Sequence, residues 1–208
     1  MWDFFLRGGP VMWPLLACSL VSLTVAIDRM LFWMALNRRS SEPLLNEVMS
    51  LCESGDWEAI RLRTAGTRDY AIRIIITGIL HRDFSMTKAM ESAAADQIKR
   101  MRRFMGVLDT MITVAPLLGI FGTVTGIIQS FDALGTTGVE RPTEVTSGIA
   151  QALITTAAGL GIAIPSVILY NFFDGLCERA ALRIEKYATS LEIVYEKLVG
   201  GDGSGRRP

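Results

Sequence analysis

Three long apolar stretches without a charged residue constrain this chain more than any other feature. They cover residues 10–27, 111–131 and 148–173, which is 18, 21 and 26 residues. As an α-helix the shortest rises about 27 Å, close to the thickness of the hydrocarbon core of a bilayer. A soluble domain of 208 residues would have to bury three helices that are apolar on every side. We therefore expect an all-α integral membrane protein with three transmembrane helices in a lipid bilayer.

Basic residues indicate how the chain crosses the membrane. Residues 38–104 contain twelve Lys and Arg side chains, and some of these lie beside an apolar stretch at each end. Because basic loops stay on the cytoplasmic side, this segment is expected in the cytoplasm. The connection at 132–147 has one basic residue, Arg141, and is expected outside. The chain is thus predicted to have its N-terminus outside and its C-terminus in the cytoplasm.

The spans divide the chain into six segments. These are an N-terminal segment with the first span at 1–37, a cytoplasmic helical segment at 38–104, the second span at 105–131, an outer loop at 132–147, the third span at 148–173, and a cytoplasmic helix with a flexible tail at 174–208. Within the cytoplasmic segment, apolar spacing and turn residues predict helices at 42–53, 57–64 and 70–80. Residues 86–105 contain no helix breaker and are predicted to run unbroken into the second span. The third span is likewise predicted to continue as a long helix into the cytoplasm.

Composition excludes several classes of function. The 21 basic and 21 acidic residues cancel, so no bulk charge favours nucleic acid. Three scattered cysteines and one histidine make a metal site improbable. The glycines match neither a phosphate-binding loop nor a dinucleotide-binding loop, and the histidine lies outside the spans. We expect no cofactor, no bound metal and no enzymatic activity.

Small residues form one face on each of the last two spans. At 100° per residue, such a face on the second span holds Ala115, Gly119, Gly122, Thr123, Gly126 and Ser130. The corresponding face of the third span holds Gly148, Ala152, Thr156, Gly159 and Ala163, with Gln151 and Thr155 beside it. Small side chains at this spacing allow two helices to approach closely within lipid. We therefore assign the glycines and alanines to helix packing.

The polar side chains on these faces have two possible roles. Thr123, Thr155, Thr156 and Gln151 can satisfy each other across the helices, or they can line an ion pathway. Pro116 and Pro165 leave carbonyl groups without a hydrogen-bond partner, which can kink each helix. Neither apolar stretch contains a titratable residue, although a proton pathway normally needs one in the membrane. If this chain conducts ions, a partner should supply that group.

Residues 114–131 (VAPLLGIFGTVTGIIQSF) and 148–171 (GIAQALITTAAGLGIAIPSVILYN) resemble the MotA/TolQ/ExbB proton channel family, and its ExbB/TolQ branch more than its flagellar branch. The resemblance implies an oligomeric helical ring, a homopentamer, around two ExbD/TolR-like single-span partners. A membrane Asp of those partners would carry the proton. Thr123 and Thr156 match positions that the family uses beside that Asp, and Pro116 and Pro165 match family prolines.

The resemblance implies the channel-forming subunit of an energy-transducing motor, or stator, driven by an ion-motive force. At Gln151 many members have Glu, so this chain lacks a second carboxylate there. Both a proton and a sodium ion remain compatible with the residues. The work driven can be outer-membrane transport, envelope maintenance or motility. The alternative is a non-conducting membrane scaffold that recruits partners through its cytoplasmic helices.

Overall fold

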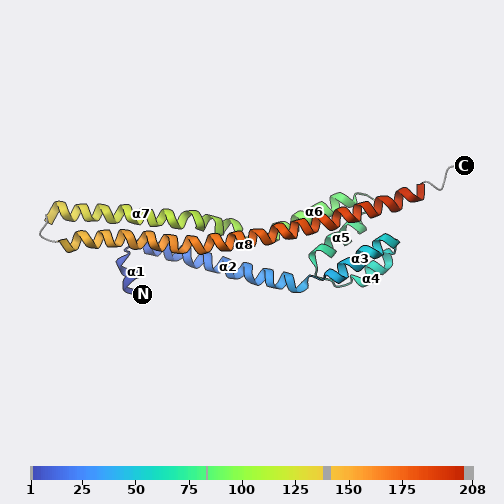
Figure 1. Ribbon diagram of the computed structural model, residues 1–208, viewed down its shortest axis with the longest axis horizontal. Helices are drawn as coiled ribbons and strands as arrows, with labels where there is room; N and C mark the ends of the chain where they lie inside the picture. Colours follow the sequence, from blue (N-terminus) through green and yellow to red (C-terminus); the bar gives the residue numbers. More distant parts are fainter. Residues whose placement is uncertain (1, 83, 138–141, 204–208) are drawn as a thin grey trace. The chain divides into compact units, whose positions relative to one another are not determined.

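The computed structural model describes residues 2–82, 84–137 and 142–203, and every regular element among them is a helix (Figure 1). The helices are α1 (Trp2–Arg7), α2 (Met12–Arg39), α3 (Glu42–Ser54), α4 (Trp57–Arg63), α5 (Tyr70–Leu80), α6 (Met86–Met101), α7 (Met105–Thr137) and α8 (Pro142–Gly203). The predicted all-α class is confirmed for this part of the chain. The helices expected at 42–53, 57–64 and 70–80 correspond to α3, α4 and α5 within one residue.

Three of the helical stretches are long and apolar enough to cross a membrane, as the sequence predicts. They contain α2, α7 and α8. Their outward faces carry large exposed apolar side chains, for example Leu20, Phe121 and Ile168. A soluble protein rarely exposes so much contiguous apolar surface, whereas such side chains face lipid at no cost.

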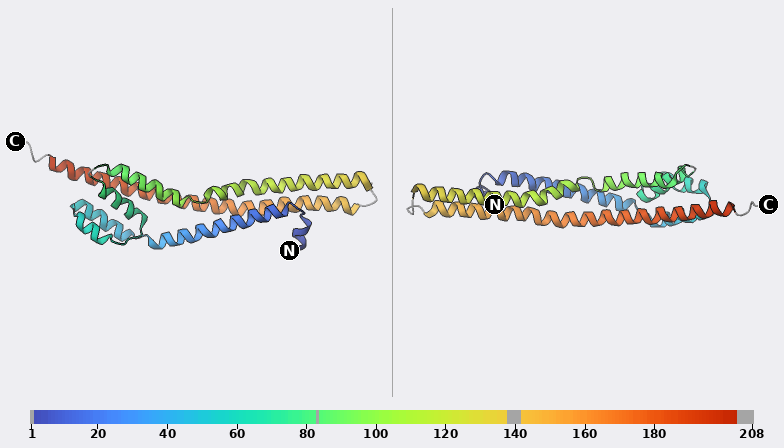
Figure 2. Two further views of the ribbon diagram at one scale, coloured as in Figure 1. Left: turned by 180° about the vertical axis from the view of Figure 1, so that it is seen from behind. Right: turned by 90° about the horizontal axis from the view of Figure 1, so that it is seen from above.

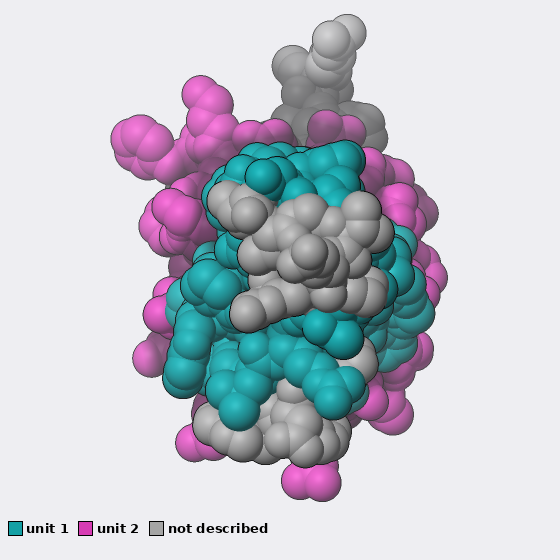
Figure 3. Space-filling model, turned by 90° about the vertical axis from the view of Figure 1, so that its left-hand side faces the viewer, with its two compact units in different colours: residues 1–30, 104–174 teal, residues 31–103, 175–208 magenta. Residues whose placement is uncertain are grey.

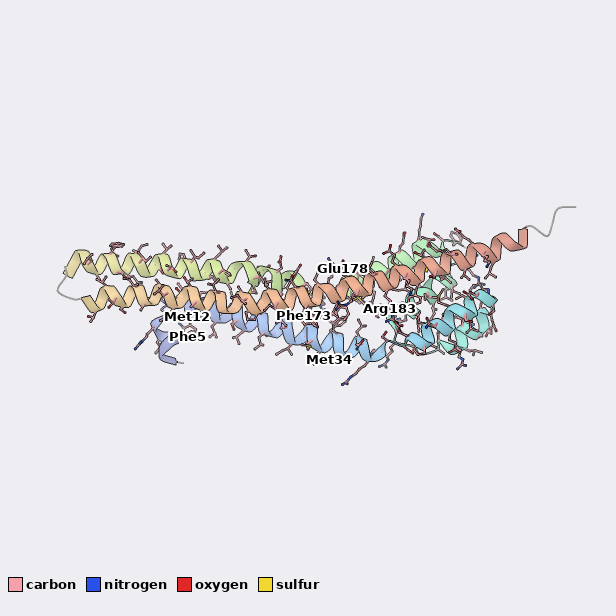
Figure 4. The ribbon with its side chains drawn as sticks, in the orientation of Figure 1. Phe5, Met12, Met34, Phe173, Glu178 and Arg183 are labelled. Atoms are coloured by element: carbon pink, nitrogen blue, oxygen red, sulfur yellow. The ribbon has the colours of Figure 1, made fainter. Side chains whose placement is uncertain are left out.

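The chain forms two compact units, coloured separately in Figure 3. Unit 1 contains residues 1–30 and 104–174, and unit 2 contains residues 31–103 and 175–208. In unit 1, α7 and the first part of α8 run antiparallel and side by side (Figures 1 and 2). The start of α2 packs on this pair through a small apolar core that includes Met12, Leu15 and Ala115, with Phe5 against it (Figure 4).

Unit 2 has its own apolar core around α5. Ile72, Ile75 and Ile79 of this helix are buried, and they pack with residues of α3, α4 and α6. The second part of α8 contributes buried residues at spacings of three and four: Cys177, Ala180, Ile184, Tyr187 and Leu191. This spacing places one stripe of α8 against the core, because residues three and four apart share a helix face.

The predicted unbroken helix from residue 86 into the second span is wrong. Helix α6 ends at Met101 and α7 begins at Met105, and Phe104 between them has a φ of 65°. The left-handed conformation costs a residue with a Cβ about 1–2 kcal/mol, so it interrupts a right-handed helix. The Phe104 ring lies 5.8 Å from the guanidinium carbon of Arg29. Residues 101–105 contain no Gly or Pro, and Gly106 lies inside α7, so the sequence pattern does not indicate a break at Phe104.

Helix also extends into regions expected to be irregular. Residues 132–137 and 142–147, expected in the outer loop, are helical parts of α7 and α8. Residues 138–141, including Arg141, lie outside the described residues. Residues 200–203, expected in the flexible tail, end α8, and residues 204–208 again lie outside the described residues. Adding a residue to an existing helix gains a hydrogen bond without a new nucleus, so a helix can continue past single unfavourable residues such as Gly135.

Cys52 offers a test of the unit 2 core. Its side chain on α3 is 0 % exposed, and burial, aided by the charge of Glu53, raises the pKa of its thiol from 9.0 to about 11. Since the thiolate is the reactive form, we expect alkylation of Cys52 at pH 8 to be at least roughly 100-fold slower in the folded protein than in the unfolded one. Peptide mass spectrometry after iodoacetamide treatment measures this. Rapid alkylation of the folded protein would contradict the buried position.

Candidate functional site

The contact between α7 and α8 is built from residues without large side chains. A Cβ atom added to Gly126 would lie 2.7 Å from the carbonyl oxygen of Gly148, and one added to Gly119 would lie 3.0 Å from that of Thr155. At Gly122 an added Cβ would clash with the side chain of Thr155. A methyl group cannot approach a carbonyl oxygen as closely as 2.7 Å, so any larger residue at Gly126 would force the backbones of α7 and α8 apart.

The face of the third span that contacts the second span also consists of residues with small side chains. A Cβ atom on Gly159 would lie 2.5 Å from the carbonyl oxygen of Ala115, and one on Gly148 would clash with Ser130. Ala152 and Ala163 are buried, with 2 % and 6 % of their surface exposed. The structure thus brings the predicted small-residue faces together, and the backbones of α7 and α8 approach as closely as that pattern allows.

Two hydroxyl groups face each other within this contact. The Thr123 hydroxyl on α7 is hydrogen-bonded to the Thr156 hydroxyl on α8. Thr123 Oγ1 also lies 3.2 Å from the carbonyl oxygens of both Gly119 and Ala152, and Thr156 Oγ1 lies 3.2 Å from that of Gly119. Both side chains are half-buried. Each hydroxyl has one proton but two acceptor lone pairs, so the pair keeps capacity to accept a further hydrogen bond.

Thr155 and Gln151 lie in different surroundings from this pair. Thr155 is 0 % exposed, and its hydroxyl donates back to α8, 2.9 Å from the carbonyl oxygen of Ala152. This placement favours helix packing for Thr155. Gln151 is half-buried, and its amide group lies against Gly9, which has a φ of 69° and leaves room only because it lacks a Cβ. The sequence analysis missed Gly9, although the Gly8-Gly9-Pro10 series before the first span was a signal of a tight backbone approach.

Helices α7 and α8 continue through their prolines without interruption. Pro116 is half-buried and Pro165 is exposed. Each lacks the N–H that would bond to the carbonyl four residues earlier, so both helices contain a carbonyl group free to accept another hydrogen bond. A kink at these positions stays a prediction from the sequence.

Comparison with known proteins agrees with these features. The sequence profile of the MotA/TolQ/ExbB proton channel family matches residues 71–186, more than half of the chain. The chain belongs to this family. A Synechocystis sp. protein named as ExbB-like 3, a biopolymer transport protein, is 32 % identical over 92 % of this chain and 93 % of its own length. The Tol-Pal system protein TolQ of Pseudomonas aeruginosa is 35 % identical over 55 % of this chain and 49 % of its own. The biopolymer transport protein ExbB of Salmonella typhimurium is 42 % identical over 40 % of this chain and 34 % of its own.

Family membership and the three apolar helices identify the chain as an energy-transducing, multi-pass protein of the inner membrane. The matched region includes the whole of α7 with Thr123 and the part of α8 with Thr156. The hydroxyl pair thus lies within the part of the chain that matches the MotA/TolQ/ExbB family, between the uncharged stretches of α7 and α8. Between Asp109 and Asp132 the sequence of α7 holds no ionisable residue, and the two aspartates themselves are exposed.

A buried arginine in the same unit was not among the predicted site residues. The Arg29 side chain on α2 is 4 % exposed, and its Nη2 lies 2.6 Å from Asp28 Oδ2. Asp28 and Arg29 directly follow the first uncharged stretch, which was the available sequence signal. A buried guanidinium needs a counter-charge, and the neighbouring carboxylate supplies it. In this chain the pair marks where the apolar part of the first span ends.

Proposed function

We propose that this chain is the channel-forming subunit of an ion-driven stator. In this proposal five copies form a ring around two ExbD/TolR-like single-span partners, and a membrane aspartate of the partner carries the ion. The N-terminus lies outside and the C-terminus lies in the cytoplasm, as the distribution of Lys and Arg predicts. The proposal rests on family membership together with one observation, the half-buried hydroxyl pair Thr123–Thr156 between the uncharged stretches of α7 and α8.

The chemistry of the pair suits a partner carboxylate. A carboxylate in a membrane needs hydrogen-bond donors to remain ionised, and it needs to lose them to take up a proton. Hydroxyl groups can both donate to the ionised acid and accept from the protonated one. In this proposal Thr123 and Thr156 exchange their mutual hydrogen bond for one to the carboxylate. The hydroxyl that does not donate to the carboxylate can donate to the carbonyl oxygen of Gly119 instead.

Gln151 and Thr155 stay outside the centre of this proposed pathway. The Thr155 hydroxyl is satisfied by its own helix, and the Gln151 amide lies against Gly9. Gln151 cannot take up a proton at neutral pH, so in this proposal it orders the start of the first span and does not carry charge. The ion-carrying step therefore falls to the partner alone.

Replacing either hydroxyl by a methyl group tests the pathway. In Thr123→Val and Thr156→Val, we expect the complex to assemble while ion flux falls by roughly 10- to 100-fold, since a hydrogen bond to a charged group contributes about 1.5–3 kcal/mol. The measurement is potential-driven uptake of protons or sodium ions into vesicles that contain the chain with its single-span partner. Native mass measurement of the same preparation gives the subunit ratio.

Thr125→Val is the matched control, because Thr125 lies on the same helix and donates only to Gly122, 3.0 Å away. We expect its flux to stay within about twofold of the unchanged protein, because its neutral hydrogen bond contributes only about 1 kcal/mol to folding. Full flux in both pathway variants would remove the site assignment. Absence of flux in the unchanged complex would favour the scaffold alternative.

A further inference from the structure

Four arginines surround a single hollow in unit 2. The pocket has a volume of about 300 Å³, and its cationic lining is Arg39, Arg68, Arg73 and Arg100. Its only acidic lining residue is Asp96. The four positive charges therefore face one negative charge. A hollow lined by one sign of charge concentrates counter-ions, which makes this pocket a candidate anion site.

The arginines converge from separate elements. Arg39 is the last residue of α2, Arg68 lies in the connection before α5, Arg73 is on α5, and Arg100 is on α6. On α5 the lining residues follow helical spacing, Tyr70, Arg73, Ile74 and Thr77, and on α6 they are Ala93, Asp96, Gln97 and Arg100. The pocket is thus formed where one face of α5 packs against one face of α6.

Three of these guanidinium groups are available to a ligand. Arg39, Arg68 and Arg73 are exposed, and they form no ion pair or side-chain hydrogen bond with any residue that the structure describes. Elsewhere in unit 2, Arg63 and Arg183 do have carboxylate partners. Repulsion between neighbouring unpaired guanidinium groups raises the free energy of the protein without a ligand, and a bound anion would offset that repulsion.

The shape and chemistry favour a phosphate group. Guanidinium groups bind both phosphate and carboxylate groups through paired N–H donors. A phosphate group carries more charge and more acceptor oxygens than a carboxylate, so it can bridge several guanidinium groups at once. The lining of the pocket also includes the apolar residues Phe32, Leu36 and Ile74. A second hollow shares Asp96 and Arg100 with the pocket and adds Lys99, Arg102 and Arg103, so the positive lining continues beyond it.

We propose that this pocket binds a phosphate group, carried either by an anionic lipid or by a soluble phosphate compound. The site lies apart from the hydroxyl pair in sequence and in unit, so it is independent of the proposed ion pathway. Binding would tie the end of the first span to α5 and α6, the helices that supply the guanidinium groups.

The test compares two double variants of the full-length protein in nanodiscs. R39Q/R73Q removes two unpaired pocket charges, and R61Q/R179Q removes two exposed arginines that do not line the pocket. In phosphatidylcholine nanodiscs, calorimetry with inorganic pyrophosphate reports a soluble phosphate ligand. In nanodiscs with phosphatidylglycerol, native mass measurement of retained lipid reports a headgroup ligand.

We expect the unchanged protein to bind one of these two probes saturably, and R39Q/R73Q to bind it at least roughly tenfold more weakly, because each charged hydrogen bond contributes about 1.5 kcal/mol or more. R61Q/R179Q should stay within twofold. If R39Q/R73Q weakens the binding of pyrophosphate alone, the ligand is a soluble phosphate compound. If it weakens the binding of phosphatidylglycerol alone, the ligand is a lipid headgroup. Equal weakening in both double variants, or no saturable binding of either probe, overturns the proposal.

If R39Q/R73Q unfolds at a lower temperature than the unchanged protein, the single variant R68Q in the connection before α5 gives the same readout. No ion gradient is involved, so failure here leaves the flux test intact.

Discussion

Replacing Gly126 and Gly159 together by alanine is expected to destabilise the protein by about 2–6 kcal/mol, since forcing a methyl group into a filled contact costs about 1–3 kcal/mol per site. Added Cβ atoms at the two positions would meet the backbone carbonyl oxygens of Gly148 and Ala115 at 2.7 and 2.5 Å. Backbone atoms cannot rotate aside as a flexible side chain can, so α7 and α8 would have to separate. Gly126 on α7 meets Gly148, and Gly159 lies further along α8 than Gly148, so the two contacts are about 16 Å apart along the helices and their effects should add.

Unfolding of the purified protein by dodecyl sulfate, followed by circular dichroism, measures this loss. The matched control is Gly106→Ala with Gly161→Ala, which also changes one glycine on each helix. Nothing lies within 4 Å of an added Cβ at either control position. The control should be neutral or gain up to about 1 kcal/mol per site, because alanine favours helix over glycine. Equal stability of the two double variants would show that the helices do not pack as described.

Asp69→Ala is expected to destabilise unit 2 by about 3–5 kcal/mol, because breaking a buried ion pair leaves the remaining charge uncompensated. The Asp69 side chain is 0 % exposed. It accepts hydrogen bonds from the backbone N–H groups of Ser41 and Ala71, both at 2.8 Å, so it joins the start of α3 to the start of α5. Its carboxylate also lies 3.9 Å from Nη2 of Arg183, the α8 residue labelled in Figure 4.

Arg183 makes this loss larger than a lost helix cap. Its side chain is 19 % exposed and hydrogen-bonds to Ser40, while Glu42 lies 3.6 Å from Nη2. The guanidinium carbon lies 5.8 Å from the ring centre of Tyr70. Without Asp69 the nearest compensation is Glu42, whose side chain is 70 % exposed and therefore screened by solvent.

Asp56→Ala provides the matched control for Asp69. Asp56 caps α4 in the same way, accepting from the N–H of Ala59 at 3.0 Å, but it is exposed and has no described cationic partner. Thermal unfolding should show a loss of only about 1 kcal/mol for Asp56→Ala, the usual contribution of a helix cap. The double variant Asp69→Ala with Arg183→Met should recover part of the loss, because it removes the unpaired charge. A single variant at Asp69 no worse than the control would refute the buried pair.

The sequence predicted the helical class, the three apolar helices and the family. It also predicted which small residues share a helix face, since this depends only on the 100° step between residues. Gly119, Gly126 and Gly159 follow that rule and lie where α7 and α8 meet. Thr123 and Thr156 were selected from the same faces, and the structure joins them by a hydrogen bond. Their role in ion transport remains a prediction.

Other features could not be derived from local patterns. Phe104 breaks the helix before the second span with a φ of 65°, although residues 101–105 contain no Gly or Pro. Gln151 and Thr155 looked equivalent to Thr156 beside the same stripe, but one lies against Gly9 and the other is buried against Gly122. At 100° per residue, Gln151 and Thr155 are about 40° apart and Thr155 and Thr156 about 100° apart around α8. Which neighbours each of them meets depends on which helices pack there.

The sequence by itself therefore determined the spans, because the lengths of uncharged stretches and the helical repeat are properties of the chain alone. Only the tertiary structure decided which polar groups meet. Asp69 and Arg183 are more than a hundred residues apart in the sequence, and Arg39 and Arg73 are 34 residues apart on different helices, so no local spacing relates the members of either pair. Contacts between distant residues follow from the packing of whole helices, which balances many apolar contacts at once and leaves no periodic signature in the sequence.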